Sequence, residues 1–394
     1  MKKIITILFF LNLVIYSQWE QVSSGMGNIS INSFALLGNK IFVGSYGNGV
    51  LFTTNSGLNW TYTSLGALQV NSVIENNNIL YAGTEFNGIY KSTNDGYNWI
   101  QVLNRPTIRA LASDGLYIYA GTSDSGIYKS SNSGISWSLS SLNNRSIHSI
   151  FINGNYIYAG CDVSGIYFST NSGVNWTQTS LNNTDVRTIC ANGSYIFAGT
   201  YGEGIFISSN NGSSWSQSQL GSEFILTLVS RENNIFAGST TFGVYASNNN
   251  GNTWIMRNEG LPYAIVAKLF IANNFLFAGR YNGGVYRREL NQLIGINPIS
   301  SEIPESFSLF QNYPNPFNPS TKIKFAIPFI PSAAQTFLSV FDIFGRQVTA
   351  LISQQLTPGT YEVEWDASNQ PSGLYLYKLT TGDFSETKKM ILVK

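Results

Sequence analysis

Short apolar segments, separated by polar turns that contain glycine, recur along most of the chain. One of them, "VNSVIEN" at residues 70–76, alternates apolar and polar positions. It is followed by the apolar segments "ILYAGT" and "GIYKS" and then, after a polar turn, by a short segment that starts at a tryptophan. Alternation with a period of two residues is typical of half-buried β-strands. The pattern therefore predicts four short strands in each unit.

The unit repeats with a regular spacing. Its tryptophan recurs every 38 or 39 residues, at Trp60, Trp99, Trp137, Trp176, Trp215 and Trp254. A seventh copy is recognisable from Ala278 and stops near Leu290, without the polar turn and the tryptophan. Four strands in roughly 40 residues are typical of one blade of a β-propeller. We therefore predict an all-β fold class, with a seven-bladed β-propeller over residues 18–290.

A strand without a partner precedes the first blade. The segment "QWEQVSSGM" at residues 18–26 contains Trp19, whereas the seventh copy lacks its last strand and its tryptophan. An open ring would leave unpaired strand edges exposed. We therefore predict that this N-terminal strand completes the seventh blade.

The polar turn has its own pattern. Each of six copies reads Ser/Thr-x-Asn-x-Gly-x-x-Trp, with the asparagines at Asn55, Asn94, Asn132, Asn171, Asn210 and Asn249. An asparagine oxygen can accept a hydrogen bond from a backbone N–H two or three residues on, and glycine adopts the positive φ of a tight hairpin. We expect the tryptophan to bury its ring between blades. The pattern therefore predicts a structural turn rather than a ligand site.

This turn resembles the Asp-box, or bacterial neuraminidase repeat (BNR), of sialidase-like propellers. The units also look like those of photosystem II stability-factor-like and sortilin-type propellers, two families that suggest protein binding rather than catalysis. The Asp-box family usually has aspartate where this chain has asparagine in all six copies. Asparagine keeps the hydrogen-bond acceptor and removes the charge, which argues against a cation-binding role for the turn.

Variable residues gather at one end of the predicted blades, which we call the loop mouth. It consists of the loops between the second and third strands, each of the form G-x4-G, and of the starts of the first strands. Arg109, His148 and Arg187 occupy equivalent positions on adjacent blades and could bind an anionic or sugar ligand. The candidate binding residues are Tyr46, Glu85, Arg109, Asp124, His148, Asp162, Arg187, Tyr201, Glu203, Arg280 and Tyr281. The alternative is that they are solvated loop residues beside a water-filled channel.

The loop mouth carries little that indicates catalysis. Sialidases of the resembled family have an Arg-Ile-Pro motif before the first Asp-box, but the first arginine here is Arg105, after the second box. His148 is the only histidine, and no motif of a nucleophilic enzyme surrounds it. A glycoside hydrolase could use two carboxylates roughly 5–9 Å apart, drawn from Glu85, Asp124, Asp162 and Glu203. We predict a secreted or cell-surface binding module for a protein or glycan ligand, with a secreted glycoside hydrolase as the alternative.

Composition limits the kinds of partner. The net charge is +1 and 11% of the residues are charged, which gives no electrostatic basis for binding nucleic acid or an anionic membrane. Two cysteines and one histidine are too few for a structural zinc site with about four Cys or His ligands. We therefore expect no metal and no cofactor. Cys161 and Cys190 could form a disulfide in an exported protein, but two small buried residues are the preferred interpretation.

The N-terminus has the pattern of a secretory signal peptide. Lys2 and Lys3 form a basic region, and residues 4–16 form an apolar run that is shorter than the roughly 20 residues of a spanning helix. We predict a signal peptide at residues 1–17; the alternative is a buried N-terminal strand. No later segment is long and apolar enough to cross a membrane, so we expect an exported, soluble mature chain.

The repeats give way to a different C-terminal segment. A linker with two prolines is expected at residues 291–306. Pro314, Pro316 and Pro319 exclude a central strand just after it, and several short strand patterns follow. This pattern predicts a small immunoglobulin-like β-sandwich over residues 307–394.

This C-terminal segment resembles the type A C-terminal sorting domain of the type IX secretion system. The resemblance is carried by "YPNPFNPST", "VFDIFGRQV", "PGTYEVEWD", "PSGLYLYKL" and "TKKMILVK". It implies Sec export, then the type IX secretion machinery as the partner of residues 307–394, and a secreted or outer-membrane cell-surface location. A carbohydrate-binding sandwich is the alternative. We expect a monomer.

Overall fold

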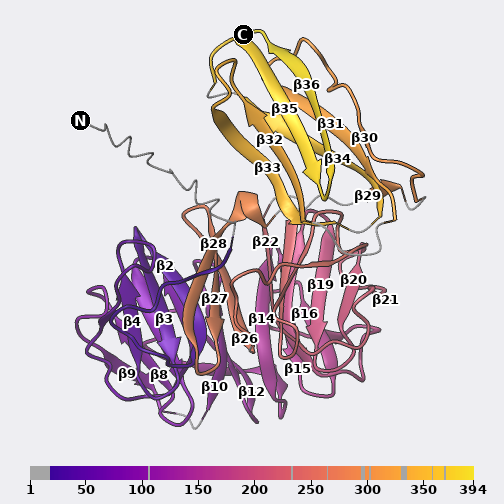
Figure 1. Ribbon diagram of the computed structural model, residues 1–394. Coiled ribbons are helices and arrows are strands. Elements are labelled where there is room, and N and C mark those ends of the chain that lie inside the picture. The colour runs from indigo at the N-terminus through magenta and orange to yellow at the C-terminus, as the bar shows by residue number, and fades with distance from the viewer. Residues whose placement is uncertain are drawn as a thin grey trace, which may run out of the picture. The chain divides into compact units, whose positions relative to one another are not determined.

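The computed structural model describes residues 18–104, 107–231, 234–263, 265–293, 298–300, 303–329, 335–356, 358–367 and 370–394. The contacts divide this part of the chain into two compact units, one from Gln18 to Gly295 and one from Ile296 to Lys394. Each is described by itself (Figure 1). The signal peptide predicted at residues 1–17 lies outside the described residues.

Within the described residues, the first unit consists of seven antiparallel sheets of four strands each, in chain order except that the N-terminal β1 is the fourth strand of the seventh sheet. Blades 1 to 3 are formed by β2 (Ile31–Leu37), β3 (Lys40–Ser45), β4 (Val50–Thr53) and β5 (Thr61–Tyr62); β6 (Val70–Asn76), β7 (Ile79–Thr84), β8 (Ile89–Ser92) and β9 (Ile100–Leu103); and β10 (Ile108–Ser113), β11 (Ile118–Thr122), β12 (Gly126–Ser130) and β13 (Ser138–Asn143). In each blade the second strand is almost entirely buried and the third strand at least half buried, as expected of sheets that are covered on both faces by neighbouring blades.

Blades 4 to 7 follow the same order. They are formed by β14 (Ile147–Asn153), β15 (Tyr156–Cys161), β16 (Gly165–Ser169) and β17 (Thr177–Gln178); β18 (Val186–Asn192), β19 (Tyr195–Thr200), β20 (Ile205–Ser208) and β21 (Ser216–Gln217); β22 (Ile225–Arg231), β23 (Asn234–Ser239), β24 (Val244–Ser247) and β25 (Ile255–Met256); and β26 (Val266–Ala272), β27 (Phe275–Arg280), β28 (Gly284–Glu289) and β1 (Glu20–Gln21). The first strands contact one another in blade order, and β26 of the last blade contacts β2 of the first. The blades therefore form a closed ring, and the predicted seven-bladed propeller is confirmed.

The N-terminal strand closes this ring. β1 pairs antiparallel with β28, so that Glu20 lies opposite Arg287 and Gln21 opposite Tyr286. The backbone N–H of Trp19 also donates to the carbonyl of Glu259 at 2.7 Å. The predicted completion of the seventh blade is confirmed. β1 gives the outer edge of β28 a partner strand, which an open ring would lack.

One tryptophan fills each interface between neighbouring blades. Trp99, for example, packs on a cluster that contains Phe42 of blade 1 and Val70 of blade 2. The other interface clusters each contain one of Trp60, Trp137, Trp176, Trp215 and Trp254. Trp19 occupies the seventh interface, in a cluster with residues of blades 6 and 7. The N-terminal segment thus supplies the large apolar surface that the seventh repeat lacks.

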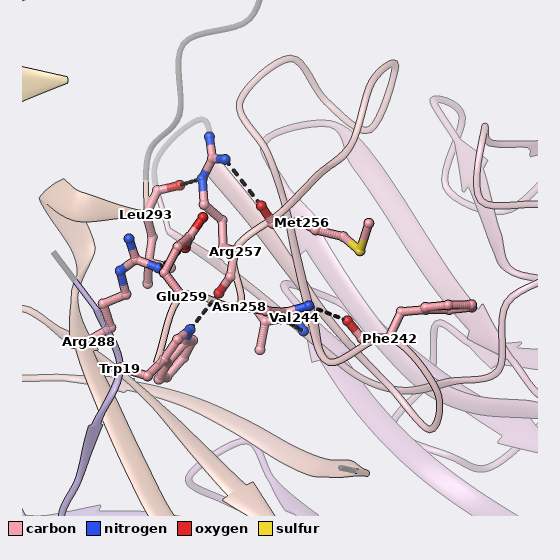
Figure 2. A network of polar contacts seen from close by, with 9 residues as sticks. All are labelled: Trp19, Phe242, Val244, Met256, Arg257, Asn258, Glu259, Arg288 and Leu293. Atoms are coloured by element: carbon pink, nitrogen blue, oxygen red, sulfur yellow. Dashed lines mark hydrogen bonds and ion pairs between the residues drawn. The ribbon is translucent and has the colours of Figure 1, made fainter. Parts of the chain in front are cut away.

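Arg257 ties both ends of the propeller to blade 6 (Figure 2). Its carbonyl oxygen accepts a hydrogen bond of 2.5 Å from Nε1 of Trp19. Its Nε donates to the carbonyl of Leu293 at 3.1 Å, just after the short helix η1 (Leu290–Gln292). The residue is 2% exposed, and burial lowers the pKa of its guanidinium to about 10, although Glu259 acts in the opposite direction.

The six repeated turns are hydrogen-bonded hairpins, as blade 2 illustrates. The hydroxyl of Ser92 accepts the N–H of Gly96 at 2.9 Å, and Oδ1 of Asn94 accepts the N–H of Asn98 at 2.8 Å. The asparagine therefore reaches four residues on, rather than the two or three expected. Asp95 and Gly96 both have positive φ, of 57° and 83°, which suits a short polar residue and glycine.

The second unit is a β-sandwich of two four-stranded sheets. One has the order β29 (Pro298–Ser300), β34 (Gly359–Asp366), β31 (Ser320–Ile327) and β30 (Ser308–Leu309); the other has β33 (Gln347–Gln355), β32 (Gln335–Phe341), β35 (Gly373–Thr381) and β36 (Phe384–Leu392). Their facing side chains, among them Ile323, Leu338 and Tyr377, form one apolar core. β29 lies within the segment expected as a linker and pairs with β34.

Candidate functional site

One backbone hydrogen bond recurs at the loop mouth of every blade. The N–H of the residue after the second strand donates to the carbonyl of the residue before the first strand. The seven bonds run from Tyr46 to Ser30 (3.0 Å), Glu85 to Gln69 (3.0 Å), Ser123 to Thr107 (3.3 Å), Asp162 to Ser146 (3.1 Å), Tyr201 to Asp185 (2.9 Å), Thr240 to Phe224 (3.0 Å) and Tyr281 to Ile265 (3.1 Å). Each bond fixes a loop residue beside the start of a first strand.

Each first strand has a β-bulge near its start. The bulged residue is the second residue of the strand, and the bulge sets the direction of its side chain. In blades 3, 4 and 5 the pairing with the second strand skips Arg109, His148 and Arg187. A bulged residue lacks a ladder partner, and its side chain is re-aimed by the local bend. The three residues that the sequence placed at equivalent positions therefore occupy equivalent bulges.

These three residues form one polar cluster with two aspartates, which we call the blade 3–5 cluster: Arg109, His148, Asp162, Asp185 and Arg187. Nη1 of Arg109 lies 3.4 Å from Nδ1 of His148. Nε2 of His148 lies 3.7 Å from Oδ1 of Asp185 and 4.0 Å from Oδ2 of Asp162. Arg187 donates to Oδ2 of Asp185 in a close ion pair. Two guanidinium groups and two carboxylates thus face a single imidazole.

Burial sets the protonation state of the cluster. Burial first, and then the charges of Arg187 and Arg109, lower the pKa of His148 to about 3. The imidazole is therefore neutral at neutral pH. Burial also raises the pKa of Asp185, while its bond to Arg187 opposes that rise.

Several buried polar atoms of the cluster lack a hydrogen-bond partner among the described residues. They are Nε of Arg109, Nε2 of His148, Oδ1 of Asp185 and Nε of Arg187. The hydroxyls of Ser146 and Thr184, beside the same strand starts, are also without a partner. Since more than about 90% of buried polar groups in folded proteins are hydrogen-bonded, such a concentration at one place indicates a site for water, an ion or a ligand.

An aromatic pair lies beside the cluster, and further exposed aromatic side chains occupy loops at the same end of the blades. The guanidinium carbon of Arg187 lies 4.7 Å from the ring centre of Tyr201, and this ring meets Phe224 edge to face at 4.8 Å. Aromatic residues that are more than a third exposed also occur on the corresponding loops and connections of blades 1, 2, 6 and 7: Tyr46, Phe86, Phe242, Tyr263 and Tyr281. Exposed aromatic surface of this kind is typical of binding sites.

Four other predicted site residues lie outside the blade 3–5 cluster. Glu85 accepts a hydrogen bond of 2.6 Å from Asn71, and Asp124 accepts one of 2.7 Å from Ser125. Glu203 is exposed, whereas Arg280 is buried with its guanidinium carbon 5.0 Å from the ring centre of Tyr286. Among the described contacts, none of these four residues joins the blade 3–5 cluster.

Sequence reasoning missed Asp185, although it left a signal. The residues before the seven first strands are Ser30, Gln69, Thr107, Ser146, Asp185, Phe224 and Ile265. Asp185 is the one acid in this set, and it stands two residues from Arg187. The two residues form an ion pair, so the arginine is not an isolated positive charge of the kind expected for an anion site.

A separate open pocket lies away from the predicted site residues. A cavity of about 380 Å³ is lined by the first strands of blades 1 to 4, with Phe34, Leu36, Ile74, Ala112 and Phe151 among its residues. None of the predicted site residues lines it. Most of its lining side chains are apolar, and Glu75 and Ser113 are the polar ones among them.

The two units match different family models. A model of the secretion system C-terminal sorting domain matches residues 311–394, and a model of the DUF6242 beta propeller domain matches residues 148–276. The protein therefore combines a β-propeller domain with a type IX secretion C-terminal sorting domain. The sorting domain implies secretion by that system, to the outside or to the cell surface.

Solved structures share the propeller fold. YCF48 bound to D1 peptide is 17% identical with a TM-score of 0.59, over 70% of this chain and 98% of that chain. YCF48 from Cyanidioschyzon merolae is 19% identical with a TM-score of 0.56, over 69% and 99%. PorZ, an essential surface component of the type IX secretion system of Porphyromonas gingivalis, is 13% identical with a TM-score of 0.55, over 93% of this chain and 59% of PorZ. At these identities the likeness shows the fold alone.

Neither curated sequence relatives nor, in the described part of the chain, membrane-spanning helices add to this picture. No curated protein is similar enough in sequence to count as a relative. Within the described residues, none of the helices has the length and apolar character that crossing a membrane requires.

Proposed function

We propose that the protein is a binding module that the type IX secretion system delivers to the cell surface or the medium, and that its loop mouth binds an extracellular protein or glycan. The observation that supports this most is the blade 3–5 cluster, where buried polar atoms without partners lie beside the partly exposed Tyr201. The assignment of the turns to the Asp-box family stays a prediction. YCF48 is described with a bound peptide, which makes peptides the first ligand class to test.

The alternative of a glycoside hydrolase has one supporting observation. The cluster holds Asp162 and Asp185 with one carboxylate oxygen of each within 4.8 Å of the other, close to the roughly 5–5.5 Å between the carboxyl groups of retaining glycosidases. However, Arg187 holds the second oxygen of Asp185. Binding is the better supported function.

The test uses the purified full-length chain on peptide and glycan arrays, with a hydrolysis readout on the glycans. We expect a ligand whose affinity falls at least about tenfold in Tyr201→Ala. Tyr97→Ala is the matched control, because Tyr97 is a similarly exposed tyrosine on a turn between third and fourth strands. Binding that Tyr201→Ala leaves unchanged would sink the proposal, and turnover that is lost in Asp162→Asn would establish the hydrolase instead.

A further inference from the structure

We propose that His148, Asp162 and Asp185 form a binding site for a divalent transition-metal ion, with Zn²⁺ as the preferred ion. The three residues come from the bulge of β14, the loop after β15 and the residue before β18. The site lies in the same blade 3–5 cluster as the proposed binding function, but its test needs no protein or glycan ligand.

The separation of the three side chains fits a metal better than direct contact. Nε2 of His148 lies 3.7 Å from Oδ1 of Asp185 and 4.0 Å from Oδ2 of Asp162, too far for hydrogen bonds. Two ligands at roughly 2.0–2.1 Å from a tetrahedral Zn²⁺ are about 3.4 Å apart. The two gaps to the histidine therefore need to close by about 0.3–0.6 Å around an ion, and the two carboxylate oxygens, which lie within 4.8 Å of each other, by at most about 1.4 Å.

The histidine gives an observation that is independent of the acidic residues. Its side chain is 7% exposed, and its Nε2 is buried without a hydrogen-bond partner among the described residues. Oδ1 of Asp185 is in the same state and points to the same space. A buried imidazole nitrogen and a buried carboxylate oxygen that face each other without bonding are what two ligands of a shared ion present.

The chemistry of the three groups selects the ion. One imidazole with two carboxylates suits Zn²⁺ and similar transition metals, whereas Ca²⁺ and Mg²⁺ prefer oxygen ligands alone. Nδ1 of His148 lies beside Nη1 of Arg109, so Nε2 is the ring nitrogen that faces Asp162 and Asp185.

The two arginines have opposite effects on such a site. Arg187 holds Oδ2 of Asp185 and leaves Oδ1 directed at the histidine, as an outer-shell partner does. Arg109 opposes binding: its Nη1 lies 3.4 Å from Nδ1 of His148, the nitrogen that must carry the proton when Nε2 binds a metal. Arg109 therefore limits the affinity, and its removal should increase it.

Asp162 keeps the site accessible. Its side chain is 46% exposed, on a loop of the mouth, whereas the other two ligands are largely buried. Three protein ligands leave a tetrahedral ion with one open position.

The experiment is calorimetric titration of the full-length, chelator-treated chain with ZnCl₂, repeated with CaCl₂ and MgCl₂, and visible absorption with Co²⁺. We expect one Zn²⁺ per chain, the absorption bands of four- or five-coordinate Co²⁺, and much weaker binding of Ca²⁺ and Mg²⁺. His148→Gln and Asp162→Asn should each lower the Zn²⁺ affinity at least about tenfold. Asp124→Asn, at an exposed acid on the neighbouring loop outside the cluster, should leave it unchanged.

Arg109→Gln separates a metal site from an anion site. A neutral amide beside Nδ1 can accept its proton, so we expect Zn²⁺ to bind about fivefold more tightly in this variant; an anion site would lose binding. Asp162→Asn guards against misfolding of His148→Gln, because Asp162 is partly exposed and its change should preserve the melting temperature. Absence of Zn²⁺ binding to the wild-type chain, unchanged affinity in a folded Asp162→Asn, or weaker affinity in Arg109→Gln would each overturn the proposal.

Discussion

Nε1 of Trp19 donates a hydrogen bond of 2.5 Å to the carbonyl oxygen of Arg257. This bond crosses the interface between blades 6 and 7. Trp60 makes the matching bond across the next interface, from its Nε1 to the carbonyl of Val22 at 2.7 Å. In contrast, Trp99 and Trp176 bond to glycines of their own turns. Each of the two interfaces beside the N-terminal strand thus has a tryptophan that donates a hydrogen bond across it.

Removing the Trp19 side chain should destabilise the propeller. We expect Trp19→Ala to lower the free energy of unfolding by about 3–5 kcal/mol, because the ring is 2% exposed and loses its apolar contacts and its bond. Deletion of residues 18–25 should lower the melting temperature more. Glu20→Ala is the control, since this exposed residue should contribute about 1 kcal/mol or less through its ion pair. An unchanged melting temperature after the deletion would contradict the closure.

Arg257 should be needed for the same interface. Arg257→Ala leaves a cavity and removes the donor to Leu293, so we expect a loss of about 2–4 kcal/mol in urea unfolding. Arg231→Ala, at an exposed arginine of the same blade, is the control and should change stability by less than about 0.5 kcal/mol. Equal effects of the two substitutions would show that the buried guanidinium does not hold the termini.

Crowding in the repeated turns can be measured at two glycines that share a positive φ. Gly96 has φ 83° and a Cβ there would meet Cγ2 of Thr63 at 2.8 Å, whereas Gly115 has φ 89° and open space around it. Both alanine substitutions pay about 1–2 kcal/mol of backbone strain, and Gly96→Ala should cost at least about 1 kcal/mol more. Chemical denaturation gives both values; equal losses would mean that the turn is not packed against blade 1.

The asparagine of the turn should tolerate aspartate but not alanine. Asn94→Asp keeps the oxygen that accepts the N–H of Asn98, so its free energy of unfolding should change by less than about 0.5 kcal/mol. Asn94→Ala should lose about 1 kcal/mol. A larger loss in Asn94→Asp than in Asn94→Ala, measured by the same denaturation, would refute the role assigned to this oxygen.

Cys161 and Cys190 are free and buried in the structure, in agreement with the preferred interpretation. Burial raises the pKa of each thiol to about 12 from a usual 9.0. At pH 8 this leaves about a thousandfold less thiolate, the reactive form. We expect iodoacetamide to modify both thiols only after unfolding. Rapid modification of the folded chain, or failure to find two thiols after unfolding without reductant, would contradict this arrangement.

The periodic parts of the structure are predictable from the sequence because each repeat meets the same neighbours. The spacing of the tryptophans reveals the blades, and the orphan Trp19 reveals the closure. The second unit follows from its ordered motifs and its strand patterns. Positions within one repeat, such as the loop residue Asp162 and the bulge residue His148, can also be assigned to the loop mouth.

The candidate site is less predictable because it arises between repeats. His148 of blade 4 lies close to Asp185, which precedes the first strand of blade 5. Neither repeat, taken alone, predicts that contact. Burial then changes the chemistry: a histidine that looks like part of a basic ring is neutral, and Arg187 is paired with an acid. The sequence contains these residues, but their distances and their exposure to water depend on the ring.

The pairing of β1 with β28 also determines the order of events during biosynthesis. Glu20 and Arg287, which form an ion pair in the closed ring, are 267 residues apart. Among the propeller strands the ribosome makes β1 first and its partner β28 last, so the ring stays open until the whole propeller has been synthesised. Such non-local pairing is slow, and the unpaired edges can meet other chains in the interval. Pairing of β1 with β28 therefore ends the period in which these two strand edges are open to pairing with other copies of the chain.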